Sequence, residues 1–90
     1  MDRFDAMSVL LAVVEEGSLS GASRRLRAPL ATVSRKVADL EKHLRTQLLV
    51  RTSRRVELTD AGRAYVAASR RILEQVEEAE RLLADVQPLI

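Results

Sequence analysis

Three segments with apolar residues at helical spacing follow one another in the first 44 residues, and two short interruptions separate them. Residues 3–16 carry two adjacent apolar rows, Phe4, Met7, Leu11 and Val14 in one and Ala6, Leu10 and Val13 in the other. A helix with so wide an apolar surface is expected to be packed on both rows. Gly17 is a natural helix end, and Ser18 is a natural N-cap for the next helix.

The second and third segments are joined by only three residues, 27–29. The second segment is short and is expected to direct Leu19, Ala22 and Leu26 inward. The third runs from about residue 30 to 44, with Pro29 suited to its first turn because the missing N–H is unpaired there. Its inward stripe is Leu30, Val33, Val37, Leu40 and Leu44. Two helices joined by so short a turn predict a helix-turn-helix.

A short hairpin and a long helix are expected after the third segment. Leu48–Arg51 and Val56–Leu58 have strand-like composition around a polar tip. Thr59 is the expected N-cap of the last helix, whose apolar stripe continues as far as Pro88. At 1.5 Å per residue this helix would be about 40 Å long, which is more than so small a domain can cover. The overhanging stripe predicts contact with a partner chain.

The composition argues against several functional classes. The chain has no Cys and a single His, His43, which we expect at the surface. It also lacks a glycine-rich phosphate loop, so we expect no cofactor, no metal ion and no enzymatic activity. The longest apolar run, Val9–Val14, is far shorter than the roughly 18 residues of a membrane span. We therefore expect a cytoplasmic protein with no membrane partner.

A strongly basic segment lies between two acidic ones. Residues 24–55 hold ten Lys and Arg against two acids, a net charge of +8. Residues 1–23 hold one base against four acids and residues 56–90 hold four against seven, so each flank has a net charge of −3. A basic block is typical of nucleic-acid binding, although a solvated charged surface is the alternative. Its coincidence with a helix-turn-helix favours binding, and the scarcity of aromatic residues disfavours RNA.

The outward face of the third helix carries residue types that suit a DNA major groove. Arg35 can fork onto guanine, Ser34 can donate or accept, and the short Ala31 and Ala38 can approach base edges closely. Residues beside this face would contact phosphates, and the basic hairpin at residues 51–55 would lie on the DNA backbone or in the minor groove. The predicted DNA-binding residues are Leu30, Ala31, Thr32, Ser34, Arg35, Lys36, Ala38, Lys42, Arg51, Arg54 and Arg55.

In order and spacing, the blocks TVSRKVADLEKHL, LLVRTSRRVELTDAG and YVAASRRILEQVEEAE resemble the N-terminal domain of LysR-type transcriptional regulators, and the resemblance covers nearly the whole chain. It implies a mainly α fold, a winged helix-turn-helix of three helices plus a short β-hairpin wing, followed by a long linker helix that pairs with a second subunit. It also implies double-stranded DNA as the partner, at a partly palindromic operator. The family's DNA-contacting positions correspond to Leu30, Ala31, Thr32, Ser34 and Arg35, with a wing contact at Arg54.

On this basis we expect a DNA-binding domain at residues 1–58, a linker and dimerisation helix at 59–87 and a C-terminal tail at 88–90. The residues expected to form the homodimer are Tyr65, Ala68, Ile72, Val76, Ala79 and Leu83. Family members continue into an effector-binding domain, so an effector small molecule would bind a domain missing from these 90 residues. A helical protein-interaction module without DNA binding is the alternative.

Three positions depart from the family pattern. Leu30 stands where a polar residue is common, Arg27 replaces a common Gly or Asn in the turn, and Arg45 replaces a common Gly after the third helix. A non-Gly residue in a left-handed conformation costs about 1 kcal/mol. Both arginines also add positive charge close to the expected DNA face.

Overall fold

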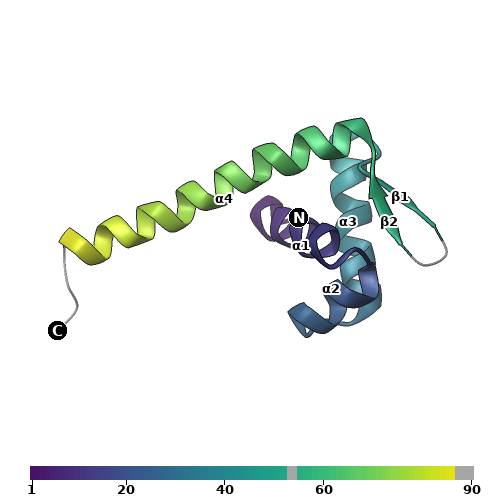
Figure 1. The fold of residues 1–90 in the computed structure, drawn as a ribbon, viewed down its shortest axis with the longest axis horizontal. Coiled ribbons are helices and arrows are strands. Elements are labelled where there is room, and N and C mark those ends of the chain that lie inside the picture. The colour runs from purple at the N-terminus through teal and green to yellow at the C-terminus, as the bar shows by residue number, and fades with distance from the viewer. Residues whose placement is uncertain (53–54, 87–90) are drawn as a thin grey trace.

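A computed structural model gives the fold and describes residues 1–52 and 55–86. The elements in this part of the chain are α1 Arg3–Glu16, α2 Leu19–Leu26, α3 Leu30–Leu44, β1 Leu49–Arg51, β2 Val56–Leu58 and α4 Asp60–Val86. The first three helices gather into one body with the hairpin at its side, and α4 runs past α1 and projects beyond it (Figure 1). The predicted fold class is confirmed. The DNA contact predicted for Arg54 and the expected tail at 88–90 lie outside the described residues.

The helix ends have local causes that the sequence predicts correctly. Ser18 and Thr59 each accept a backbone N–H from three residues further on, at 2.9 Å, as N-cap side chains do. Gly17 ends α1 with a φ of 79°, a left-handed conformation. Pro29 differs slightly from its expected place, because it precedes α3 as the N-cap residue and does not lie in the first turn.

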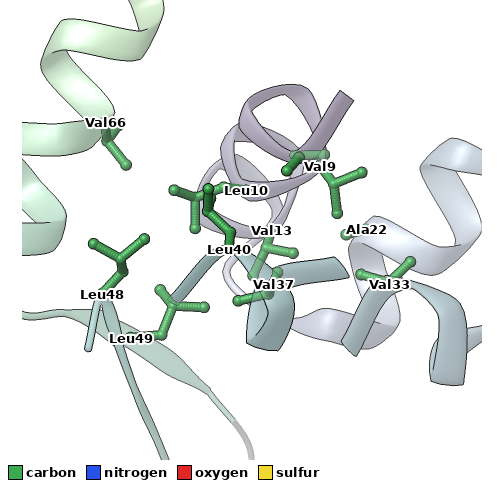
Figure 2. Close-up of a cluster of buried hydrophobic side chains, with 12 residues drawn as sticks. Val9, Leu10, Val13, Ala22, Val33, Val37, Leu40, Leu48, Leu49 and Val66 are labelled. Carbon is green, nitrogen blue, oxygen red and sulfur yellow. The ribbon is translucent and has the colours of Figure 1, made fainter. Parts of the chain in front are cut away.

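The hydrophobic core lies where α1 is enclosed by α2, α3, α4 and β2. Figure 2 shows the side chains that meet there: Val9, Leu10 and Val13 of α1, Ala22 of α2, Val33, Val37 and Leu40 of α3, Leu48 and Leu49 at the hairpin, and Val66 of α4. Full burial of one such Val or Leu contributes about 1.5–3 kcal/mol. These contacts hold α3 by one face and leave the opposite face outward.

The expected inward rows are partly wrong. Phe4 is 56% exposed, and the rest of its row on α1 is only half-buried. The buried residues of α1 are Ala6, Val9, Leu10, Ala12 and Val13. Because α1 is apolar around most of its circumference, periodicity alone does not show which side faces α3. Leu26 and Leu30, also expected inward, are 37% and 49% exposed.

The second strand of the hairpin is tied to the body of the domain. In the antiparallel pair, Leu49 lies opposite Leu58 and Arg51 lies opposite Val56. The N–H of Val56 also donates to the carbonyl of Gly17 at 3.3 Å. This bond ties β2 to the turn between α1 and α2, so the position of Arg51 relative to the helices is set by the fold.

Candidate nucleic-acid interface

The outward face of α3 lies opposite the buried residues, as the helical period requires. Val33, Val37 and Leu40 are at most 1% exposed, which fixes the orientation of the helix. Among the predicted DNA-binding residues of α3, the exposed ones are Leu30, Ala31, Arg35, Ala38 and Lys42, and the half-buried ones are Thr32, Ser34 and Lys36. The face that carries Ser34 and Arg35 is therefore accessible, as expected.

An open groove of about 460 Å³ lies between the start of α2, the first half of α3 and the hairpin. Its lining residues are Ser18, Leu19, Ser20, Leu30, Ala31, Ser34, Arg51, Thr52, Arg55 and Val56. Five of these, Leu30, Ala31, Ser34, Arg51 and Arg55, are predicted DNA-binding residues. The fold thus brings α3 and the hairpin together at one groove that carries hydroxyl and guanidinium groups.

A hydrogen bond joins the wing to α3 inside this groove. Nη1 of Arg51 donates to Oγ of Ser34 at 3.1 Å. Next to Arg51 in the hairpin, the N–H of Thr52 donates to the carbonyl of Arg55 at 2.8 Å. Two residues that the sequence assigns separately to DNA contact therefore contact each other.

Two outward basic side chains are paired with acids of α1. Nζ of Lys36 lies 2.6 Å from Oδ2 of Asp5, and Nη1 of Arg25 lies 2.6 Å from Oε1 of Glu15. The hydrogen bond with Glu15 raises the pKa of Arg25 above its ordinary value, so this guanidinium stays charged. The ion pair between Lys36 and Asp5 is partly exposed, and such pairs contribute only about 0–1 kcal/mol. A phosphate group can therefore compete with Asp5 for Lys36.

Glu41 is a positioning residue that the sequence analysis missed. Its Oε2 accepts the backbone N–H groups of Leu48 and Leu49, at 2.7 and 3.1 Å, and so anchors the start of the hairpin to α3. The carbonyl of Leu48 accepts the N–H of Thr59 at 3.0 Å, and β1 begins at Leu49, one residue later than predicted. A Cβ at Gly62 would clash with the same carbonyl. One signal was available, since Glu41 is one of two acids in the basic block.

The apolar stripe of α4 is covered at one end and bare at the other. Tyr65 and Ala68 are half-buried, and Tyr65 packs against the core of its own chain. Further along, Ile72, Val76 and Leu83 are 36%, 43% and 63% exposed. The other exposed apolar residues of this half include Ala79, Leu82 and Val86. Figure 1 shows this half of α4 extending away from the remaining helices.

The described residues include no helix long and apolar enough to cross a membrane. The same part of the chain contains no group of three or more His, Asp or Glu side chains arranged to hold a metal ion. His43 is exposed near the end of α3, as expected.

Comparison with known proteins gives consistent matches along the chain. An HTH-type transcriptional repressor of Pseudomonas aeruginosa is 43% identical over 83 residues, which is 92% of this chain and 26% of the relative. The chain thus spans about a quarter of the length of the curated relatives it matches.

Two solved structures have the same fold. The DNA-binding domain of CbnR, solved in complex with DNA, matches with a TM-score of 0.86 and 34% identity over 97% of this chain and 100% of that one. Full-length LysG from Corynebacterium glutamicum, solved with bound effector Arg, matches with a TM-score of 0.86 and 32% identity over 94% of this chain and 29% of that one. The family described as bacterial regulatory helix-turn-helix protein, lysR family, matches residues 4–63. The chain belongs to the LysR family of bacterial helix-turn-helix regulatory proteins.

Proposed function

We propose that this chain is the DNA-binding part of a bacterial transcription regulator and binds double-stranded DNA as a homodimer, at a partly palindromic operator. The observation that carries the proposal is the shared groove, where the outward face of α3 meets Arg51 and Arg55 of the wing. The similarity to a DNA-binding domain solved on DNA supports the same function. Because the relatives are named as transcriptional regulators, the proposed role is DNA binding and not catalysis. The proposed location of the protein is the bacterial cytoplasm.

In the proposed complex α3 enters the major groove and the wing lies on the DNA backbone or in the minor groove. Arg35 is exposed on the outward face and forks onto a guanine, which is a specific base contact. Arg55 contacts phosphate and adds affinity that does not depend on sequence. Lys36 also contacts phosphate, once its ion pair with Asp5 is broken. The domain division at 1–58, 59–87 and 88–90 is part of this proposal.

The proposed dimer forms through the half of α4 that projects beyond the core. Ile72, Val76 and Leu83 present an apolar stripe to solvent there, and pairing with a second α4 would cover it. The two recognition helices of such a dimer would contact two half-sites about one DNA turn, or a multiple of it, apart. An effector would act through a region outside these residues.

Titration of the 90-residue chain against labelled duplexes tests the proposal. Fluorescence anisotropy should show binding whose log affinity falls with log salt concentration, with a slope near −0.9 per phosphate neutralised. Arg35→Ala should reduce the preference for a selected duplex over a random one, whereas the matched control Arg55→Ala should weaken both nearly equally. Salt-independent binding, or equal losses from the two variants on both duplexes, would contradict the assignment.

The alternative is a protein-interaction module that uses the bare stripe of α4 and does not bind DNA. Both readings require self-association, so sedimentation that shows only monomer at micromolar concentration would contradict both. DNA titration separates them, because only the regulator reading predicts a bound duplex.

A further inference from the structure

The hydrogen bond between Arg51 and Ser34 influences whether the Ser34 hydroxyl donates or accepts a hydrogen bond toward DNA. A serine hydroxyl has one O–H to donate and two lone pairs that accept, so a free Ser34 would bond to either a donor or an acceptor. In this structure Arg51 Nη1 donates to Oγ at 3.1 Å. A guanidinium has only donors, so the direction of this bond is not ambiguous.

The geometry of the contact is set by elements that do not depend on DNA. Ser34 lies on α3 one position after the buried Val33, and Arg51 lies on β1 opposite Val56, whose N–H is tied to Gly17. Glu41 holds the start of the same strand against α3. The arginine is therefore positioned before any ligand arrives.

The positive charge of Arg51 has a second effect on the hydroxyl. A cation at the oxygen polarises the O–H bond, which makes the hydroxyl a stronger donor. An approaching amino group would bring a further partial positive charge beside the guanidinium, which is unfavourable. No other hydrogen bond of Ser34 Oγ occurs within residues 1–52 and 55–86, so its O–H is free to point into the groove.

We propose that Arg51 fixes Ser34 as a hydrogen-bond donor, and that the base facing Ser34 in the major groove must present an acceptor. This inference rests on the proposed function and adds a rule of specificity to it. Guanine offers N7 and O6, adenine offers N7, and thymine offers O4. Cytosine offers only its N4 amino group, which is a donor. Cytosine is therefore the disfavoured base at the position that Ser34 contacts.

In this scheme Arg51 is a positioning residue that influences sequence preference without touching a base. Its bond to Ser34 uses one of the five N–H donors of the guanidinium, and the others remain for a phosphate. Loss of Arg51 should thus have two separable effects, a weaker affinity for every duplex and a change of preference at one base. Arg55 lines the same groove, and in the part of the chain that the structure describes its side chain has no such bond to α3, so Arg55→Ala is the matched control.

Selection of bound sequences from a random duplex pool provides the test. Wild type and Ser34→Ala are selected in parallel, and the base position where the alanine variant loses preference is the one that Ser34 contacts. The affinity of wild type, Arg51→Ala and Arg55→Ala is then measured for duplexes with each of the four bases at that position. Circular dichroism confirms that each variant is folded.

We expect wild type to bind the cytosine duplex roughly tenfold more weakly than the best one, a typical penalty for one unfavourable base pair. Arg51→Ala should reduce this ratio to about twofold or less, and Arg55→Ala should leave it unchanged while weakening all four duplexes. Three results would overturn the inference. Wild type could prefer cytosine, or Arg51→Ala could keep the same ratio of affinities between the best duplex and the cytosine duplex. Ser34→Ala could also lose affinity for all sequences equally, with no change of base preference. These results leave DNA binding intact, whereas failure of wild type to bind any duplex would overturn the proposed function as well.

Discussion

Replacing Arg27 and Arg45 with glycine should stabilise the fold. Each arginine is the first residue after a helix, and its own backbone is in the left-handed conformation, with a φ of 53°. The N–H of Arg45 donates to the backbone carbonyl of Lys42 at 3.2 Å, and the next N–H, of Thr46, donates to the backbone carbonyl of Glu41 at 3.1 Å. The same pair of bonds follows α2, at 3.3 and 3.1 Å. This Schellman arrangement strongly prefers glycine at the left-handed position.

The size of the effect follows from two opposing terms. The left-handed conformation costs a residue with a Cβ about 1–2 kcal/mol. Glycine avoids this penalty, but it gives the unfolded chain about 0.4–1 kcal/mol of extra conformational freedom. Each substitution should therefore raise the free energy of unfolding by about 0.5–1 kcal/mol. The two sites end different helices and should act additively, so the double variant should raise Tm by roughly 4–16 °C.

Thermal and urea unfolding, followed by circular dichroism at one protein concentration, measure this gain. The matched control is Gly17→Ala, because Gly17 has a φ of 79° and no atom within 4 Å of the added Cβ. That variant should lose about 1 kcal/mol. If the control loses stability while Arg27→Gly and Arg45→Gly gain none, the arginine side chains make compensating contacts and the backbone argument is wrong.

Three further substitutions test individual contacts. Asp5→Asn should release Lys36 and tighten binding to every duplex by about 1.5- to 5-fold, and unchanged anisotropy titrations would refute this. Ser69→Ala should raise the free energy of unfolding by about 1 kcal/mol in thermal melts, because the buried Oγ has no hydrogen-bond partner in the described chain. A loss of stability there would contradict the reasoning. Glu41→Ala should lower the free energy of unfolding by about 2–4 kcal/mol, since two N–H groups lose a carboxylate acceptor. Urea unfolding with a loss below about 0.5 kcal/mol would refute the role of Glu41 as an anchor.

Local chemistry explains why the element boundaries could be predicted. Ser18, Thr59 and Gly17 act on backbone groups within a few residues of themselves, so their roles are visible in a short window of sequence. Most of the inward stripe of α3 was also predicted correctly, because the opposite face is mainly polar, although Leu30 at its start is exposed. By contrast α1 is packed by several elements, and its pattern did not show that Phe4 would be exposed.

The contacts that shape the candidate interface could not be predicted in the same way. The bond between Arg51 and Ser34 joins a strand to a helix, and the pair of Lys36 with Asp5 joins two helices. Such pairs depend on how the elements pack, which no local periodicity encodes. The sequence predicted five of the residues that line the groove, but not that two of them, Arg51 and Ser34, would restrain each other.

An amide chemical-shift titration of the labelled chain with a selected duplex shows which residues of the domain contact DNA. If the outward face of α3 reads DNA, the largest changes should fall on the outward half of α3, around Ala31, Ser34 and Arg35, and on the hairpin residues Arg51 and Arg55. Amides of the buried face of α1 should change little. Changes confined to α4, or no changes at all with duplex in excess, would contradict the claim that this face of α3 reads DNA.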